Sequence, residues 1–276
     1  MPAIIPARLK QQAAILADQF DEPPVYVRSL HHLLETYAER ASRPGQAGEP
    51  PPLLQSYKVR PPVLRQILLE LIPLAHENPQ GALALCDALW EQPVLEFRLL
   101  SARLLGQIPC EAPSPVIGRL KDWIKPDVEQ RLLDELFSGG TNCLRQNNAP
   151  AMLELARGWM EEKDLFYQQL GLRVLLNLVN EPSYENLPVF YRLLQPFIRS
   201  VPARLRPDVL DLIAALARRS PSEMVYFLRQ TVALPNSPDA PYLIRQSLHQ
   251  FPSEQEEELR ILSRQISERR RKGGKS

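Results

Sequence analysis

Arginines and aromatic residues occur together in one stretch of the sequence, residues 186–207, which reads NLPVFYRLLQPFIRSVPARLRP. The stretch contains four arginines, three aromatic rings and no acidic residue. Guanidinium groups bind phosphates, and aromatic rings stack on bases. These residues therefore predict a nucleic-acid surface, with Arg199, Arg204 and Arg206 as candidate phosphate contacts. The alternative is an amphipathic helix pair that carries ordinary arginines on its outer face.

The cysteines and histidines do not form the pattern of a metal site. Cys86, Cys110 and Cys143 are far apart and include no CxxC pair, and the four histidines have no metal-ligand spacing with them. We therefore expect no metal, no other cofactor and no disulfide framework.

The overall charge does not favour nucleic acid, because 33 basic residues nearly cancel 32 acidic ones. Residues 268–276, ERRRKGGKS, hold five basic residues and one acid, so the rest of the chain carries a charge of about −3. Like charges and glycines predict that these nine residues form a disordered basic tail. Only a local basic surface on the body would serve phosphate binding.

Leucine and alanine recur at helical spacing almost throughout the chain, and most of the 28 prolines lie singly between such segments. Because proline is favoured in the first turn of a helix and disfavoured in its interior, it separates about fourteen predicted helices between residues 6 and 271. No run of β-branched residues alternates with period two. The proline- and glycine-rich residues 42–52 predict a surface loop. No apolar run is long enough for a membrane span, and we expect a cytoplasmic protein.

Two helical segments superimpose in register: LLSARLLGQI (99–108) and QLGLRVLLNL (169–178). Both place a small residue before an arginine, and Ala214 and Ser247 occupy similar positions in later helices. Helix starts recur every 30 to 40 residues, the period of paired-helix repeats. The sequence thus predicts an all-α, right-handed HEAT-like solenoid of about seven helix pairs over residues 1–267, in which small residues allow close helix approach.

The segment LWEQPVLEFRLLSARLL (89–105) resembles the AlkD-type DNA alkylation repair family, in which a Leu-Trp helix end precedes a Glu-Phe helix start. DLFYQQLGLRVLLNL (164–178) and YLIRQSLHQF (242–251) are similar to two later helices of that family. The resemblance covers residues 60–180 and returns near 240–252, with one extra helix pair near 183–219. It implies a HEAT-like array that holds duplex DNA in its concave groove and a glycosylase that removes cationic alkylated purines.

The resemblance also implies a site of two tryptophans, an aspartate and an arginine. In such a site the carboxylate stabilises the cationic sugar, the rings attract the cationic base, and the arginine holds a phosphate. The family's Trp-Asp-x-Val-Asp pattern falls on QRLLD, so Asp134 is the candidate catalytic aspartate and Gln130 replaces a tryptophan. The arginine position falls on Gln169, beside Tyr167, and the second tryptophan falls near His249 or Gln250.

Three functions remain open. The first is a catalytically degenerate module that binds DNA or protein, with Gln130, Gln169 and Tyr167 at the former DNA contacts. The second is an active alkylpurine DNA glycosylase that uses Asp134, with Tyr167 or Trp123 supplying a ring. The third is a protein–protein scaffold without a nucleic-acid role. Each candidate residue also has a plain explanation: the polar ones suit an exposed helix face, and the tryptophans suit the core.

Overall fold

The computed structural model describes residues 5–38 and 54–273, with side chains described up to residue 265. Within these residues the regular secondary structure is helical, and one isolated bridge joins Gln55 to Val94. The chain forms two compact units, residues 1–148 and 149–276. The predicted loop at 42–52 lies outside the described residues.

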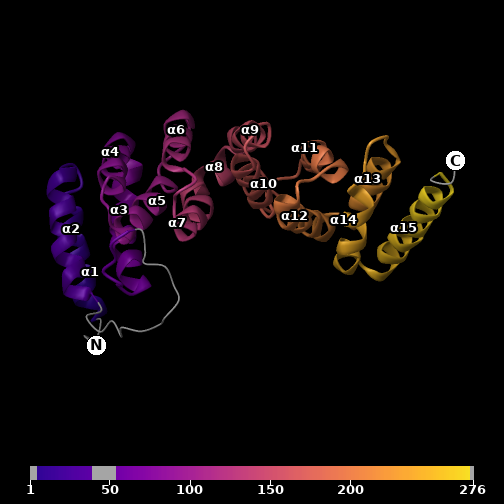
Figure 1. The fold of residues 1–276 in the computed structure, drawn as a ribbon. Coiled ribbons are helices and arrows are strands. Elements are labelled where there is room, and N and C mark those ends of the chain that lie inside the picture. Colours follow the sequence, from indigo (N-terminus) through magenta and orange to yellow (C-terminus); the bar gives the residue numbers. More distant parts are fainter. Residues whose placement is uncertain (1–4, 39–53, 274–276) are drawn as a thin grey trace. The chain divides into compact units, whose positions relative to one another are not determined.

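Unit 1 consists of stacked helix pairs that form two layers. In one layer α1, α3, α5 and α7 pack in succession, and in the other α2 packs against α4 (Figure 1). Its helices are α1 (Pro6–Ala17), α2 (Pro23–Tyr37), α3 (Pro61–Glu77), α4 (Pro79–Trp90), α5 (Leu95–Leu105), α6 (Ser114–Trp123), α7 (Gln130–Glu135), the π-helical turn η1 (Leu136–Gly140) and α8 (Asn142–Asn147).

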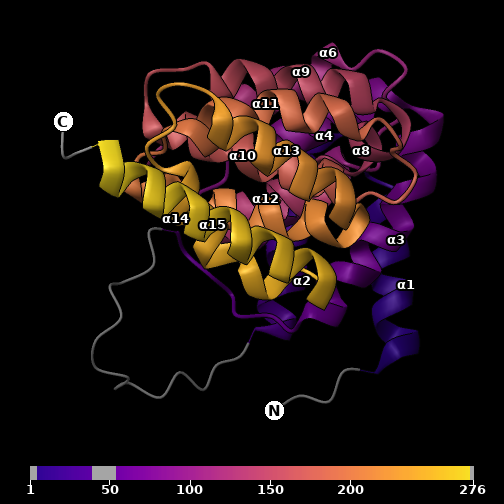
Figure 2. The same ribbon diagram turned by 90° about the vertical axis from the view of Figure 1, so that its right-hand side faces the viewer.

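Unit 2 repeats the two-layer arrangement, with α10, α12 and α14 in succession and α11 packed against α13. The last helix, α15, packs against both α13 and α14 (Figure 2). The helices are α9 (Ala149–Met160), α10 (Leu165–Val179), α11 (Leu187–Arg199), α12 (Arg206–Arg219), α13 (Pro221–Ala233), α14 (Ala240–Ser247) and α15 (Ser253–Gly273), with the 3-10 turns η2 (Ala203–Leu205) and η3 (Leu248–Gln250).

The prediction of an all-α helical-repeat fold is confirmed. Ten helices of the described chain, among them α1, α6 and α14, have proline in one of their first two positions, as the punctuation of the sequence indicated. The handedness of the superhelix and a single domain over 1–267 stay predictions. Helix α15 continues to Gly273 and so includes part of the stretch 268–276, whose role as a basic tail also stays a prediction.

The predicted helix boundaries differ from the structure between residues 126 and 147. We expected one helix over 126–138, whereas α7 begins at Gln130, a π turn follows it, and α8 is an additional short helix. The π turn ends in Gly139 and Gly140, which have no side chains and therefore allow close contact with the backbone of α5. The spacing of apolar residues in the sequence does not predict such a contact.

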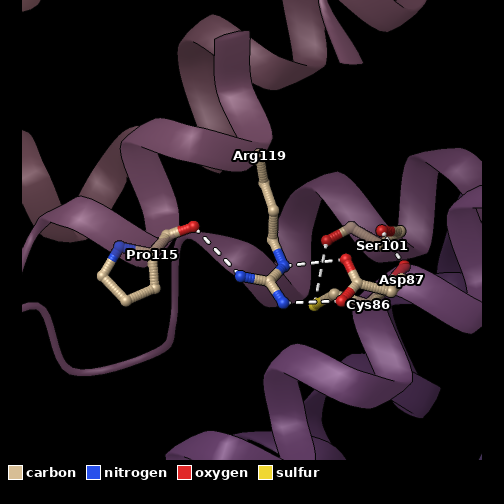
Figure 3. Close-up of polar contacts among 5 residues, drawn as sticks. All are labelled: Cys86, Asp87, Ser101, Pro115 and Arg119. Atoms are coloured by element: carbon tan, nitrogen blue, oxygen red, sulfur yellow. Dashed lines mark hydrogen bonds and ion pairs between the residues drawn. The ribbon is translucent and has the colours of Figure 1, made fainter. Parts of the chain in front are cut away.

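Small residues hold the helix pairs together, as the repeat predicted. Ser101 on α5 is fully buried against α4: its hydroxyl donates to the Cys86 carbonyl at 2.8 Å, and the Cys86 thiol donates to the Ser101 carbonyl (Figure 3). Burial raises the pKa of the Cys86 thiol well above its usual range, so this sulfur stays protonated. The close approach of α4 and α5 therefore depends on a side chain no larger than serine.

An ion pair extends the same contact to α6. The Arg119 guanidinium donates through Nε to Asp87 on α4 at 2.7 Å, and it also donates to the Pro115 carbonyl of its own helix (Figure 3). The two Arg119 nitrogens meet both carboxylate oxygens, which is the bidentate geometry that orients an arginine most strongly. Asp87, the residue after Cys86, thus connects α4 to α6 next to the contact with Ser101.

Gly171, which occupies the position equivalent to Ser101, packs α10 against α9 without any side chain. A Cβ atom at Gly171 would lie 2.7 Å from the Ala156 carbonyl oxygen and 2.5 Å from Cγ of Met160. Both distances are shorter than van der Waals contact, so the two backbones already touch.

We predict that Gly171→Ala lowers the free energy of unfolding by about 1–3 kcal/mol, because the added methyl group forces α9 and α10 apart. Gly158 on α9 is the matched control, since a Cβ atom there would have open space around it. Gly158→Ala should raise stability by about 0.5–1 kcal/mol through the lost freedom of the unfolded chain. Urea denaturation of both variants measures the contrast, and equal effects would contradict the packing argument.

Candidate nucleic-acid interface

The candidate aspartate lies on the short helix α7. Asp134 is exposed, and its Oδ1 accepts a hydrogen bond of 2.6 Å from the side-chain amide of Gln130, one turn earlier. Leu132 and Leu133 are buried on the opposite face and anchor the helix. The structure therefore brings Gln130 and Asp134 together, and the amide at the predicted tryptophan position occupies one carboxylate oxygen.

Helix α7 is oriented by a contact with α5. Arg103, the arginine of the first repeat, forms an ion pair of 2.7 Å with Glu135, and both side chains are largely buried. Glu135 follows Asp134 directly, so this ion pair turns the neighbouring Asp134 outward. The sequence identified Arg103 as a repeat position but not its partner, which lies 32 residues away.

The expectation of no disulfide was wrong, because Cys110 and Cys143 are joined by one. Cys110 follows the end of α5 and Cys143 lies in α8, and their Cα atoms are 6.0 Å apart although 33 residues separate them in sequence. The close packing of the glycine-ended π turn on α5 brings the two cysteines together, and sequence spacing does not reveal such a contact. Cys86 is a buried free thiol.

In unit 2, the glutamine at the predicted arginine position has an acidic partner. Gln169 donates a hydrogen bond of 2.8 Å to Asp208 on α12, and Arg173, one turn further along α10, forms an ion pair of 3.3 Å with the same carboxylate. Arg173 is the repeat equivalent of Arg103. In both units, therefore, the repeated arginine is neutralised by an acid from the next helix of its layer.

We call α1, α3, α5 and α7 the arginine layer of unit 1, and α10, α12 and α14 the arginine layer of unit 2. A third pair, Arg206 with Asp239 at 3.2 Å, lies at the start of α12 and connects it to the residue before α14. Arg206 also lies over the Tyr242 ring, with its guanidinium carbon 4.9 Å from the ring centre. These arginines hold helices together, which limits their availability to phosphates.

The three candidate arginines of the stretch 186–207 differ in their surroundings. Arg199 donates to the Pro235 carbonyl at 2.8 Å, and Arg206 is paired as described above. Arg204 is exposed and makes no hydrogen bond or ion pair with the described residues. Of the three, only Arg204 is both exposed and unpaired within the described part of the chain.

The aromatic candidates are already engaged. Tyr167 is half-buried, and its ring meets Phe166 edge-on at 5.2 Å. Trp123 is buried and stacks on Trp90 at 4.4 Å, and the Arg98 guanidinium lies over the Trp90 ring, 5.3 Å from its centre. Near the expected second tryptophan, His249 and Gln250 bond to each other. The stacked tryptophans and their arginine form a packed unit that has no room for a base between the rings.

Arg131 is a residue that sequence reasoning missed. It lies on α7 between Gln130 and Asp134 and is exposed, and its side chain has no hydrogen bond or ion pair among the described residues. Arg131 is the second residue of the QRLLD motif, so the sequence places it one turn before Asp134. An unpaired guanidinium one turn from an exposed carboxylate suits contact with a phosphate beside a reacting sugar.

A model of the DNA alkylation repair enzyme family matches residues 52–236, more than half of the chain. The protein belongs to the DNA alkylation repair enzyme family. The match begins before α3 and ends after α13, so it includes α7, α10 and the helix pair α11–α12 that the resemblance left as an insertion. No curated protein and no solved structure matches the chain significantly.

The family assignment gives the protein a role related to DNA alkylation repair. Asp134 belongs to unit 1, whereas Gln169 and Tyr167 belong to unit 2. Among the described residues, no helix has the length and apolarity that crossing a membrane requires, and no group of His, Cys, Asp and Glu suits a metal ion.

We predict that Asp208→Asn lowers the free energy of unfolding by about 1–3 kcal/mol, because a largely buried carboxylate that pairs with Arg173 and accepts from Gln169 is replaced by a neutral amide. Asp122→Asn is the matched control, since Asp122 is exposed on α6. It should change stability by less than about 0.5 kcal/mol. Thermal unfolding followed by circular dichroism measures both, and a neutral Asp208→Asn would contradict the proposed role of the pair.

Proposed function

We propose that this member of the DNA alkylation repair enzyme family binds duplex DNA and excises alkylated purines slowly or not at all. The observation that carries the proposal is the hydrogen bond from Gln130 to Asp134. This hydrogen bond supports a site that keeps the carboxylate of Asp134 but has an amide in place of the aromatic ring that would attract a cationic base. The protein then acts as a binding module at alkylated or undamaged duplex.

The case against fast excision depends on two missing interactions. A cationic purine needs an electron-rich ring, and the amide of Gln130 provides none. A phosphate needs a cation, and the neutral Gln169 already donates to Asp208. Losing two interactions of about 2 kcal/mol each slows a reaction about a thousandfold.

The case for DNA binding depends on the unpaired cations. Arg131 on α7 and Arg204 before α12 are exposed and lack partners among the described residues, whereas Arg103, Arg173 and Arg206 are paired with carboxylates. A free guanidinium binds a phosphate without giving up an existing partner. We assign the phosphate contacts of the body to Arg131 and Arg204 in the first place.

An active glycosylase is the second candidate function, because Asp134 is exposed and its carboxylate is held in place by an amide donor. A protein–protein scaffold is the third, and the paired charges of the arginine layers favour it, since they leave those surfaces nearly neutral. Excision assays separate the second candidate from the first, and the salt dependence of duplex binding separates the third.

We predict that this protein releases 7-methylguanine from methylated duplex DNA about a thousandfold more slowly than a site that has both the aromatic ring and the arginine. We also predict that Asp134→Asn does not lower the rate of release further. Asp122→Asn serves as the control for a lost exposed carboxylate. Chromatography of the released bases under single-turnover conditions provides the measurement. Rapid release that Asp134→Asn abolishes and Asp122→Asn preserves would establish the active glycosylase instead.

We predict that duplex affinity falls with rising salt, and that Arg131→Gln and Arg204→Gln each reduce the log–log slope by about one unit, because each removes one phosphate contact. Arg28→Gln is the matched control, since Arg28 is exposed on α2 outside the arginine layer. Fluorescence anisotropy at several salt concentrations measures the slope. If both variants bind like the unaltered protein, these contacts are wrong; if no salt-dependent binding occurs at all, the scaffold function is preferred.

A further inference from the structure

Residues 136–147, which we call the clamp segment, consist of the π turn η1 and helix α8, and η1 packs directly on α5. A Cβ atom added at Gly106 would lie 1.8 Å from the carbonyl oxygen of Gly139, and one added at Gly140 would lie 3.2 Å from the Ala102 carbonyl oxygen. The backbones of the two segments therefore touch with no side chain between them. Such a contact is lost if the clamp segment moves by a fraction of an ångström.

The disulfide fixes the clamp segment at the same place. Cys143 in α8 is bonded to Cys110, and its backbone N–H donates to the Gly106 carbonyl at 3.1 Å. Asn148, just after α8, reaches back to the Cys110 carbonyl at 3.4 Å. One covalent bond and two hydrogen bonds thus join the end of the clamp segment to the chain that follows α5.

Helix α7 depends on this attachment. The helix contains six residues, and a helix of this length is unstable unless tertiary contacts hold it. The Ser138 hydroxyl donates to the Asp134 carbonyl at 2.7 Å, and the Thr141 hydroxyl donates to the Phe137 carbonyl at 2.6 Å, so α7 and the clamp segment form one continuous hydrogen-bonded piece. The position of Asp134 and Arg131 therefore depends on the clamp segment as well as on the direct contact of α7 with α5.

We propose that the Cys110–Cys143 bond is a reversible redox site that controls the order of the clamp segment and, through it, the placement of α7. The part that concerns DNA depends on the function proposed above. Oxidised protein holds α7 in the arrangement described here. Reduced protein keeps the fold, and its clamp segment opens more often.

The co-reactant is a dithiol. One thiolate of the dithiol attacks a sulfur of the protein disulfide, the S–S bond breaks, and a mixed disulfide forms. The second thiolate of the dithiol attacks that mixed disulfide. The two electrons pass to Cys110 and Cys143, which take up protons and become thiols, while the dithiol is oxidised to its own disulfide.

Access to the bond is limited in the closed state, because Cys110 and Cys143 are only 3% and 6% exposed. A reductant reaches the sulfurs when the segment opens, so the rate of reduction reports the opening. Cys86 is an internal control in the same unit: it is fully buried on α4 and bonded to the Ser101 carbonyl. Cys110 and Cys143 are therefore expected to respond to a reductant, whereas Cys86 is a thiol in both redox states.

The first experiment counts thiols in the full chain after purification in air. Alkylation in denaturant, followed by mass spectrometry, should label Cys86 alone before treatment with dithiothreitol and all three cysteines after it. Peptide mapping should recover Cys110 and Cys143 as one linked pair. Labelling of all three cysteines before reduction would overturn the proposal.

The second experiment measures amide hydrogen exchange of oxidised and reduced protein. Reduction should accelerate exchange in residues 136–147 by about tenfold or more and leave α12 unchanged, because only the clamp segment loses its covalent attachment. Cys143→Ser should match the reduced protein, and Cys86→Ser should retain the oxidised pattern and its response to dithiothreitol. If Cys143→Ser does not fold, the reduced unaltered chain supplies the same comparison. Unchanged exchange in fully reduced protein would contradict the proposal that the disulfide controls the order of the clamp segment.

Duplex binding by anisotropy, measured in both redox states, tests the consequence for the site. The reduced protein should bind at least about threefold more weakly, since ordering α7 on the duplex then costs additional free energy. Equal affinity in both states would overturn the control of the site by the disulfide. Absence of binding in both states would instead contradict the proposed function. The hydrogen-exchange experiment would still test whether the disulfide controls the order of the clamp segment.

Discussion

Close approach of paired helices at a small residue is the constraint on which this structure depends. Helices α4 and α5 approach each other across Ser101, and α9 and α10 approach each other across Gly171. An isolated helix pair does not cover its own apolar faces, so its stability comes from stacking on the next pair. A small residue allows the close approach within each pair, and the two units have it at equivalent sequence positions.

The repeat also explains the electrostatics. The arginine two residues after Ser101 or Gly171 lies on the surface of its layer, where an acid of the next helix neutralises it: Glu135 for Arg103 and Asp208 for Arg173. The repeated arginine occurs on α5 and on α10, and in both places the paired acid offsets its charge. These two arginines therefore serve helix stacking, whereas the exposed Arg131 and Arg204, which lack a side-chain partner among the described residues, lie outside the repeat position.

Membership in the DNA alkylation repair enzyme family and the local chemistry of this chain have to be considered together. The family assignment provides the link to DNA. The local chemistry shows a carboxylate with an amide donor and a glutamine held by an acid, where the resemblance implies a ring and a cation. A protein that keeps the scaffold and loses contacts with the reacting base retains binding more readily than catalysis, because catalysis requires interactions that strengthen in the transition state.

The sequence by itself determined the helical fold, most helix boundaries and the family, because each depends on local information: apolar periodicity, proline in the first turn, and short motifs such as QRLLD. It did not determine what each functional residue contacts. Arg103 meets Glu135 across 32 residues, Gln169 meets Asp208 across 39, and Cys110 meets Cys143 across 33. Such pairs arise only when stacked helices bring distant segments together. The π turn after α7 was missed for the same reason, since the contact of Gly139 with Gly106, and not any local preference, selects it.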